Sequence, residues 1–511
     1  MEAINPSMPE FLRHLSSSAG TLVPVSVEID IPTLTPLAAL EALRPLGYPV
    51  LLESARINEK IGRYSFVSAD PYLIFKSRGE SVELILPETP IGKYGKRATM
   101  KRKPIAKLRE LMNNYRTGRV PGLPPFTGGA VGFFSYDFVH QFEKLPRTAE
   151  VDLDIPESYF AFVDLVVAFD HILKKKWVIV NPGAREQELG FHRPCQEQWE
   201  SLYEKAAERL TVLVRLLRRA ASPGDASAFD GKKVLQPVAV SSNLTQAEFE
   251  TMVRRSKEYI GAGDIYQTNL SQRLSLRISE IDTLRLYKIL CEINPSPFAA
   301  YLDFGDLQLV SSSPERLVRL YDSAVDTRPI AGTRRLGRNN EETRVLSSEL
   351  LTNAKERAEH IMLLDLERND LGKVCDYGTV AVNEMMVVED YSHVIHIVSN
   401  VRGKLSPGKD AFDLVHAMFP GGTITGVPKI RCMEIIDELE PVARGPYTGS
   451  IGYISNSGDM DLNIIIRTFV VKDGNAYIQV GAGIVADSDP TWEYYETLQK
   501  AEALKKAVEM L

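Results

Sequence analysis

The runs NIIIRTFVV, residues 463–471, and NAYIQVGAGIV, residues 475–485, decide the fold class of this chain. Both are rich in apolar and β-branched residues, a composition typical of buried strands. Similar runs, KWVIV at residues 176–180 and LQLVSS at residues 307–312, lie among helical patterns in both halves of the chain. Strand and helix patterns do not alternate regularly, as a parallel sheet would require. The sequence therefore predicts a mixed α/β protein with largely antiparallel sheets.

Composition places the chain among ordinary globular proteins. It has 511 residues, 44% of them hydrophobic and 25% charged, which is enough for two or three domains. A net charge of −7 gives no reason to expect nucleic acid, and the basic stretch KYGKRATMKRK, residues 93–103, is interpreted as a solvated surface loop. No apolar run approaches the length of about 18 residues that a membrane helix needs, and the N-terminus has no leader pattern. We expect a cytoplasmic protein without a membrane partner.

A linker separates two predicted helices. Residues 196–219 place Trp199, Leu202 and Leu210 on one apolar stripe, which predicts an amphipathic helix. The stretch AASPGDASAFDGKK then follows, rich in Ser, Gly, Ala and Asp. Thr245, with Glu248 three residues later, forms a capping box that opens a second helix through Ile260.

The domain boundary is placed between residues 220 and 244. We expect an N-terminal domain over residues 1–235 and a catalytic domain over residues 236–511, because the side chains able to do chemistry are concentrated after residue 245.

The segment TRPIAGTRR, residues 327–335, is interpreted as a strand entering a tight turn at Gly332, with Thr333 just past it. A glycine at that point lets a backbone N–H approach a ligand closely. Ala331 stands where a reactive side chain could reach the same ligand, and it carries none.

Two pairs of glutamates have helical spacing. Glu356 and Glu359 are three residues apart, and so are Glu493 and Glu496. Lys500 lies four residues beyond Glu496, on the same helix face. A solvated helix surface is one interpretation of either pair. Two pairs converging from separate helices would instead suit Mg²⁺, which prefers hard oxygen ligands and completes its octahedron with water and substrate oxygens.

The glycines of GAGIVADS, residues 481–488, precede the second glutamate pair. Glycines in such a position can expose backbone N–H groups in the nest geometry that binds anions. With Arg467 and Lys500 they would hold the negative charges of a carboxylated substrate.

At these residues the chain resembles the chorismate-utilising enzymes: anthranilate synthase component I, aminodeoxychorismate synthase component I, and the isochorismate and salicylate synthases. The resemblance covers nearly the whole chain. The ordered motifs that carry it are SSSPERL, TRPIAGTRR, KERAEHIMLLDLERNDLG, YSHVIHIVSNVRG, FPGGTITGVPKIRCMEIIDELEP, GPYTGSIGY and QVGAGIVADS.

The resemblance implies two stacked, largely antiparallel β-sheets flanked by helices, with the active site in a cleft between them. It also implies a role for each residue of the site. Glu359 and Glu496 would ligate Mg²⁺ directly, and Glu356 and Glu493 through water. The substrate-binding set would be Gly332, Thr333, Tyr447, Arg467, Gly481, Ala482, Gly483 and Lys500. The catalytic set would be Glu315, His396, Gln267 and Thr423. Glu315 would protonate the leaving C4 hydroxyl of chorismate, and His396 would assist the loss of pyruvate.

The attacking group at C2 differs between branches of this family. Water-using members carry a lysine base at the position of Gln267, which cannot abstract a proton. Many aminodeoxychorismate synthases carry a lysine at the position of Ala331 that forms a covalent adduct with the ring. Ala331 therefore favours direct attack by ammonia and anthranilate synthase chemistry. The motifs FPGGTITG, YQTNLSQR, YTGSIGY and MDLNIIIRT favour aminodeoxychorismate synthase, so that branch stays open. A non-catalytic paralogue that binds chorismate is a third alternative. The presence of Glu315 and of all four glutamates of the two pairs disfavours it.

The resemblance also implies two partners beyond chorismate. None of the four cysteines, Cys195, Cys291, Cys375 and Cys432, has the strand-to-helix setting of an amidotransferase nucleophile, nor a CxxC spacing for zinc. Ammonia is therefore expected from a separate glutamine amidotransferase subunit. An inhibitory tryptophan site is expected from LLES and NPSPF, with contacts from Ser54, Pro297, Phe298 and Ala299.

Overall fold

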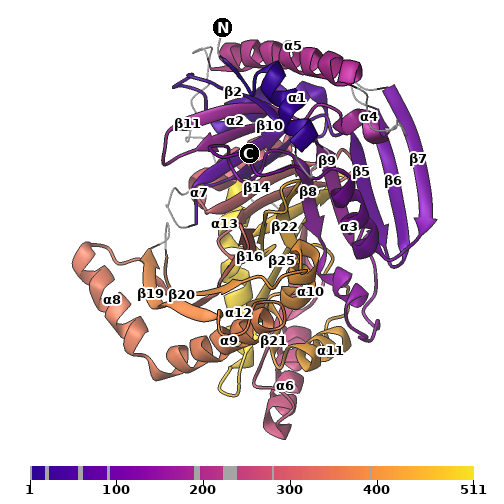
Figure 1. Ribbon diagram of the computed structural model, residues 1–511. Coiled ribbons are helices and arrows are strands. Elements are labelled where there is room, and N and C mark those ends of the chain that lie inside the picture. The colour runs from indigo at the N-terminus through magenta and orange to yellow at the C-terminus, as the bar shows by residue number, and fades with distance from the viewer. Residues whose placement is uncertain are drawn as a thin grey trace.

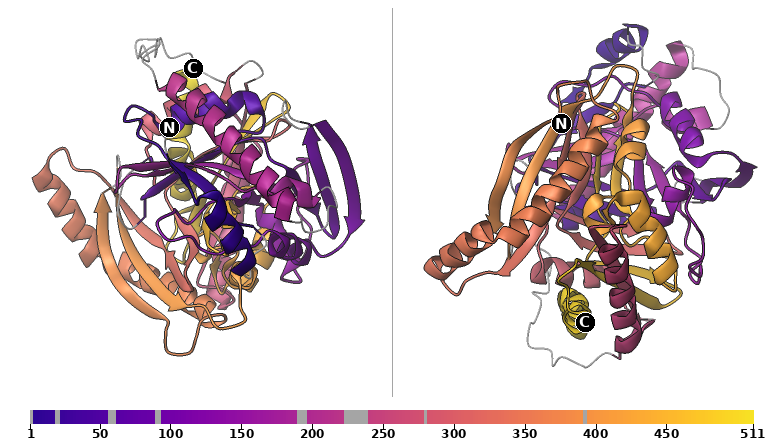
Figure 2. Two further views of the ribbon diagram at one scale, coloured as in Figure 1. Left: turned by 45° about the horizontal axis from the view of Figure 1, so that its top comes forward. Right: turned by 90° about the horizontal axis from the view of Figure 1, so that it is seen from below.

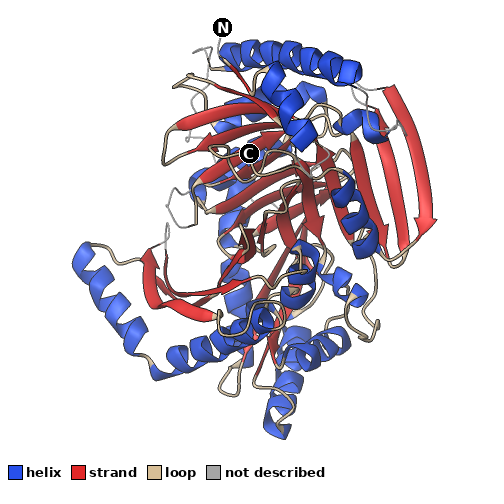
Figure 3. Ribbon diagram, in the orientation of Figure 1, coloured by secondary structure: helices blue, strands red, loops and turns tan. Residues whose placement is uncertain are grey.

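The computed structural model describes residues 3–17, 22–55, 61–88, 93–188, 196–221, 239–278, 281–390 and 394–511. Within them, two large antiparallel sheets are flanked by helices, as the sequence predicts (Figures 1 and 3). Residues 222–238, which hold the predicted domain boundary, lie outside the described residues. None of the helices described combines the length and the apolar character needed to cross a membrane.

The first sheet has thirteen strands among the described residues. In order across the sheet they are β1 (Ile4–Asn5), β2 (Val25–Glu28), β11 (Lys175–Val180), β10 (Leu165–Asp170), β4 (Tyr64–Ser68), β3 (Val50–Glu53), β14 (Phe298–Asp303), β15 (Gln308–Ser313), β24 (Thr468–Lys472), β25 (Asn475–Ile484), β13 (Gln267–Arg277) and β12 (Ser241–Ser242), with β21 (Gly426–Val427) also beside β13.

The second sheet has twelve strands in the same described ranges. Their order is β18 (Ile330–Arg335), β20 (Val394–Lys404), β17 (Ala324–Arg328), β16 (Arg316–Tyr321), β23 (Met460–Asn463), β22 (Ser450–Ser455), β8 (Gly129–Phe134), β9 (Ser158–Val163), β5 (Leu73–Arg78), β6 (Ser81–Glu88) and β7 (Lys93–Lys101), with β19 (Ala381–Asp390) also beside β20.

Both sheets join the two halves of the chain. In the first sheet β3 pairs with β14, where Leu52 lies opposite Ala300. In the second sheet β8 pairs with β22, where Gly132 lies opposite Gly452. Backbone hydrogen bonds therefore run without interruption from the N-terminal half into the C-terminal half in each sheet.

The helices cover the outer faces and ends of the sheets (Figures 1 and 2). They are α1 (Met8–Ser17), α2 (Pro36–Leu43), α3 (Pro104–Asn114), α4 (Ala184–Glu188), α5 (Gln196–Ala220), α6 (Gln246–Ala262), α7 (Thr283–Ile293), α8 (Asn340–Thr352), α9 (Ala354–Gly372), α10 (Ala411–Met418), α11 (Lys429–Leu439), α12 (Pro490–Lys500) and α13 (Glu502–Glu509), with the 3₁₀ turns η1 (Arg44–Leu46), η2 (Tyr136–Gln141) and η3 (Gly422–Ile424).

Two helix predictions are confirmed. The apolar stripe of α5 is buried, with Leu210 and Leu217 fully inaccessible. The capping box that opens α6 has both of its hydrogen bonds, and the helix ends at Gly263 in the left-handed conformation (φ 84°).

The two sheets pack face to face. Phe66 of β4 makes an edge contact with Tyr453 of β22, with ring centroids 5.4 Å apart, and Tyr159 of β9 stacks on Phe304 at 4.1 Å. One apolar cluster contains residues from both sheets, including Val50, Phe66, Ala161 and Ile451. Each sheet thus buries one face against the other, the arrangement of a sandwich.

The run NIIIRTFVV is not one strand. Asn463 ends β23 in the second sheet, and Thr468 begins β24 in the first. The four residues between them cross from one sheet to the other, and Arg467 has a left-handed backbone (φ 51°). A non-glycine residue held in that conformation is uncommon and is concentrated at functional sites. The crossing places Arg467 between the sheets, which local strand propensity could not indicate.

The predicted tight turn at Gly332 is wrong. Strand β18 continues through Gly332 and pairs with β20 on both sides of it, so the chain does not reverse. The register shifts between Ala331 and Thr333, and Gly332 has φ of 64°. The glycine therefore forms a β-bulge, in which one extra residue is accommodated by a conformation that glycine adopts without strain.

The basic stretch of residues 93–103 is also corrected, because it forms the edge strand β7 and not a loop. Residues Gly95 to Thr99 are exposed. Lysine and arginine on an edge strand hinder pairing with another chain.

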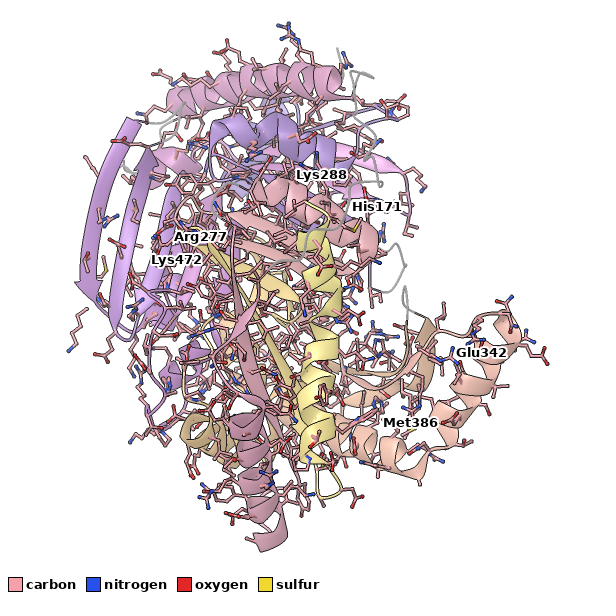
Figure 4. The ribbon with its side chains drawn as sticks, turned by 180° about the vertical axis from the view of Figure 1, so that it is seen from behind. His171, Arg277, Lys288, Glu342, Met386 and Lys472 are labelled. Carbon is pink, nitrogen blue, oxygen red and sulfur yellow. The ribbon has the colours of Figure 1, made fainter. Side chains whose placement is uncertain are left out.

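A lobe formed by α8, α9, β18, β19 and β20 stands away from the rest of the molecule (Figures 1 and 2). Figure 4 shows Glu342 and Met386 on it from behind. The lobe has a small apolar cluster of its own, in which Leu350, Ile395 and Ile397 are fully buried. Helix α9 and strands β18 and β20 carry one group of predicted site residues, and α12 carries another.

Candidate active site

The candidate general acid Glu315 lies just before β16 and is 5% exposed. Its Oε1 accepts hydrogen bonds from the Thr423 hydroxyl at 3.0 Å and the Ile330 N–H at 3.3 Å. Burial raises the pKa of Glu315 to about 8, although both hydrogen bonds oppose the rise and the nearby carboxyl of Glu367 adds to it. A carboxyl group with this pKa is protonated at neutral pH and can donate a proton.

His396 lies on β20 opposite Thr333 of β18 and is 3% exposed. Its Nδ1 lies 3.3 Å from the Gly332 carbonyl oxygen. A carbonyl can only accept, so Nδ1 carries the proton and Nε2 is the basic nitrogen of the ring. Burial, with the positive charge of Arg467 nearby, lowers the pKa of His396 to about 3. The imidazole is therefore neutral.

The glycines of β25 do not form a nest. Gly481, Ala482 and Gly483 are extended and pair with β13, so the expected alternation of left- and right-handed backbone is absent from this segment. The reason for glycine is space. A Cβ on Gly481 would lie 2.7 Å from the Tyr447 hydroxyl.

The backbone of β25 still points polar groups away from β13. The Gly481 carbonyl accepts a hydrogen bond from Lys500 Nζ at 2.9 Å. The N–H and C=O of one strand residue point to the same side, so the Gly481 N–H also faces that side, as does the Gly483 N–H two residues on. Two N–H groups and one ammonium could thus bind a carboxylate from an extended strand.

Gln267 and Gly483 are direct neighbours. A Cβ on Gly483 would lie 2.7 Å from Gln267 Nε2. Gln267 is 8% exposed, and within the described ranges its Oε1 has no hydrogen-bond partner. A buried amide oxygen without a protein partner is available to a ligand.

Two of the four predicted metal glutamates lie on α9 in the lobe and two on α12 in the body. Burial raises the pKa of Glu359, and the charges of Glu356, Glu493 and Glu496 raise it further, against Lys355. Burial likewise raises the pKa of Glu493, which is 8% exposed. The charges of both helices therefore act on Glu359.

Three of these glutamates have basic neighbours. Arg334 Nη1 lies 2.9 Å from Glu356 Oε1 and Lys500 Nζ 2.8 Å from Glu496 Oε1. Lys355 Nζ is 3.9 Å from Glu359 Oε1.

A Cβ on Gly332 would lie 2.9 Å from Glu356 Oε2, so the bulge makes room for this carboxylate. In the described part of the chain, no three His, Cys, Asp or Glu side chains are already arranged around one metal position. The donor set itself fits Mg²⁺, since it consists of hard, crowded carboxylate oxygens.

A cavity of about 220 Å³ lies apart from these residues. The four predicted effector residues, Ser54, Pro297, Phe298 and Ala299, all line it. Arg316, the residue after Glu315, is also in its wall.

Several contacts of the site were not predicted. Arg334 binds Glu356, the Ile330 N–H binds Glu315, and Glu367 acts on the charge of Glu315. The two arginines that follow Gly332 in TRPIAGTRR were a usable signal for the first of these contacts. The other two depend on which segments pack together.

A buried acid, a neutral histidine, backbone N–H groups, cations and paired carboxylates are the groups that an enzyme site for a multiply charged anionic substrate would use. The sequence pattern of the chorismate binding enzymes matches residues 70–506, and the chain belongs to this family.

Similar proteins carry two activities in their names. Anthranilate synthase component 1 of Acetivibrio thermocellus is 42% identical over 489 residues, covering 96% of this chain and 95% of that protein. Aminodeoxychorismate synthase component 1 of Bacillus subtilis (strain 168) is also 42% identical, covering 90% and 92%. The crystal structure of anthranilate synthase component I from Streptococcus pneumoniae TIGR4 superposes with a TM-score of 0.72 at 33% identity, covering 88% of this chain and 94% of that one.

Proposed function

We propose that this chain is the large, chorismate-aminating subunit of anthranilate synthase, converting chorismate and ammonia to anthranilate and pyruvate. The observation that carries the choice is the position of Ala331. It lies between Ile330, whose N–H binds Glu315, and Gly332, whose carbonyl binds His396. At the point of β18 between acid and base, the chain thus offers a methyl group and no amine that could attack the ring.

Each residue then has a defined part in the reaction. Ammonia forms a bond to C2, the ring double bonds shift, and the C4–O bond breaks. Glu315 gives its proton to the departing hydroxyl, which leaves as water. His396 Nε2 takes the proton from C2 as the C3–O bond breaks, and the ring becomes aromatic. The departing enolpyruvate takes up that proton at its methylene carbon to become pyruvate, and the proton lost by the new C2 ammonium group restores Glu315. The free Oε1 of Gln267 would accept a hydrogen bond from the incoming ammonia.

The carboxylate groups of chorismate would be held by two sets of groups. Glu359 and Glu496, with Glu356 and Glu493 through water, would hold Mg²⁺, which supplies positive charge to a substrate carboxylate when bound. Lys500, Arg467, Tyr447 and the backbone of β25 would bind the remaining negative charge. Mg²⁺ would compete with Lys500 for Glu496, because Lys500 Nζ lies 2.8 Å from Glu496 Oε1.

Aminodeoxychorismate synthase component I is the second candidate. The 42% identity to the Bacillus subtilis protein equals that to the Acetivibrio thermocellus protein, so overall similarity does not choose between them. Both names designate a first component, which supports a separate amidotransferase subunit as the source of ammonia.

The 220 Å³ cavity supports a tryptophan effector site. Glu53 lines it, and burial raises the pKa of its carboxyl group, which accepts a hydrogen bond from Tyr287 at 2.5 Å. Phe298 supplies an aromatic face and Ser54 a polar edge, the combination that an amino acid with an indole ring requires.

One product assay tests the proposal. The purified chain is incubated with chorismate, Mg²⁺ and ammonium salt at mildly alkaline pH, and the products are separated. Fluorescent anthranilate with an equal amount of pyruvate is expected. Aminodeoxychorismate without pyruvate would assign the second candidate, and unchanged chorismate would contradict both.

A further inference from the structure

Arg444 lies outside the set of predicted site residues, yet it binds the segments that carry three of them. It is 3% exposed and lies between α11 and the turn that leads into β22. Its Nε donates to Glu440 Oε2 at 2.9 Å, and Nη2 donates to Glu440 Oε1 and the Asn269 carbonyl, both at 2.7 Å. Its Nη1 donates to the Ile424 carbonyl at 3.0 Å and the Thr448 hydroxyl at 3.2 Å. All five N–H donors of the guanidinium group are therefore used.

The acceptors belong to separate parts of the chain. Ile424 follows Thr423, whose hydroxyl binds Glu315. Asn269 follows Gln267 by two residues on β13. Thr448 follows Tyr447, over whose ring the guanidinium lies at 5.6 Å from the centroid. The guanidinium group of Arg444 thus fixes the distances between the three segments that contain Thr423, Gln267 and Tyr447.

Glu440 completes the arrangement. It is 3% exposed, and its Oε1 also accepts from the backbone N–H and the hydroxyl of Ser271 on β13, both at 2.8 Å. The carboxylate therefore ties Arg444 to β13 a second time. A lysine at position 444 would offer three donors from a single point, too few and too compact for this set of acceptors.

We propose that Arg444, held by Glu440, is a positioning residue of the active site that sets Thr423, Gln267 and Tyr447 relative to one another. It touches no substrate and acts through the backbone of these three segments. A displacement of about 1 Å in such groups can lower the rate about 100-fold. The rate effect rests on the proposed function, while the positioning of the segments does not.

The alternative is that the Arg444–Glu440 pair only stabilises the fold. The chain offers a matched control in Arg185 of α4, whose Nη2 lies 2.8 Å from both Asp70 and Asp164, two fully or nearly fully buried aspartates. Arg185 is in the N-terminal half and contacts none of the predicted site residues. Replacing either arginine by lysine weakens the pairing of buried carboxylates and lowers stability, although Arg209 also pairs with Asp70 and Asp164 and keeps part of this pairing in the Arg185 variant.

The experiment compares Arg444→Lys with Arg185→Lys in the full-length chain. We expect both to lower the thermal midpoint, but only Arg444→Lys to lower kcat with chorismate and ammonium, by about 100-fold. Hydrogen–deuterium exchange should become faster over residues 421–427 and 445–449 in Arg444→Lys alone. If Arg444→Lys does not fold, Glu440→Gln is used, with about a tenfold loss of kcat expected for the weaker perturbation.

The pH profile separates positioning from stability. Glu315 is faced by Thr423 of η3, the Ile330 N–H of β18, Glu367 of α9 and Arg467, and the Thr423 hydrogen bond lowers the pKa of its carboxyl. If Thr423 is displaced, that pKa rises and the falling alkaline limb of kcat moves to higher pH.

Two outcomes would overturn the proposal. One is a kcat of Arg444→Lys within threefold of that of Arg185→Lys. The other is unchanged hydrogen–deuterium exchange over residues 421–427 and 445–449. If wild-type chain consumes no chorismate, the proposed function fails, and the exchange measurement alone decides the positioning role.

Discussion

The candidate active site and the 220 Å³ cavity are joined by two consecutive residues, Glu315 and Arg316, but their charged side chains are paired differently. Glu315 faces Thr423 and the active site, and Arg316, the next residue, lines the cavity. Successive side chains of an extended chain point to opposite sides, so Glu315 faces the candidate site and Arg316 faces the cavity.

Two arginines of the cavity wall are paired with carboxylates, while burial raises the pKa of Glu53 in the same wall. Arg316 makes two hydrogen bonds to Asp461, each of 2.9 Å, and Arg319 binds Asp326 at 2.8 Å. In the active site, by contrast, Glu315 is kept protonated, His396 is kept neutral, and the charges of three other glutamates help to raise the pKa of Glu359. Groups perturbed in this way are typical of catalysis, whereas paired charges suit the binding of an intact ligand. A ligand in the cavity would contact Arg316, and a shift of the Arg316 backbone would also move Glu315, the residue before it.

The largest effect is expected at the acid. Glu315→Gln should lower kcat by about 10³-fold, because general acid catalysis typically contributes 10²–10⁴-fold and an amide cannot protonate a departing hydroxyl. Arg316→Lys is the matched control across the peptide bond, and it should retain most of kcat. Steady-state rates of chorismate consumption measure both. An equal loss in the two variants would mean that the two sides of the strand are not functionally distinct.

Removal of a predicted metal ligand should have the next largest effect. Glu359→Gln or Glu496→Gln should lower activity about 100-fold and weaken Mg²⁺ binding at least tenfold, since each removes a hard anionic ligand. Calorimetric titration with Mg²⁺ gives a readout besides activity. Tryptophan binding to the cavity should stay unchanged in both. Wild-type Mg²⁺ affinity in either variant would place the metal elsewhere.

At a fixed concentration of free ammonia, the rate should fall as the pH rises through 8. The pKa of Glu315 is raised to about 8, so the acid is protonated below this pH and loses its proton as the pH rises through it. At a fixed total of ammonium salt, free ammonia increases over the same range, so the rate should rise, pass a maximum and decline. His396, with a pKa lowered to about 3, stays neutral and should add no limb near pH 6.5. An inflection there would contradict the neutral histidine.

The cavity variant should separate regulation from chemistry. Phe298→Ala should raise the tryptophan concentration needed for inhibition about tenfold, the loss of roughly 1.4 kcal/mol of aromatic contact. The rate without tryptophan should change less than twofold. Inhibition curves at fixed chorismate measure this. No tryptophan inhibition in the wild type, or a variant equally sensitive to it, would remove the effector assignment.

The smallest effect is expected from Gln267→Lys. A lysine beside Gly483 would supply a base for water, and burial would lower its pKa toward the neutral form. We expect a minor isochorismate product beside the main one, detected by chromatography. A folded variant that binds chorismate but forms no isochorismate would count against the assignment of this position.

The sequence by itself determined the local elements and the chemical groups. The apolar stripe of α5, the capping box of α6 and the spacing of Glu496 and Lys500 are set within a few turns of helix, so short-range periodicity is sufficient to predict them. The family motifs also predicted an acid, a histidine and two glutamate pairs for the site, because the chemistry of the family requires these residue types.

Only the tertiary structure decided how these groups meet. NIIIRTFVV has one propensity along its length, but its two ends pair with different sheets, and Arg467 lies at the crossing. The bulge at Gly332 follows from its pairing with β20, more than 60 residues away along the chain. Arg444 joins segments separated by up to 175 residues, and the charges of Glu493 and Glu496 on α12 act on Glu359 of α9. Strand pairing and side-chain packing set these approaches, and neither has a local signature in the sequence.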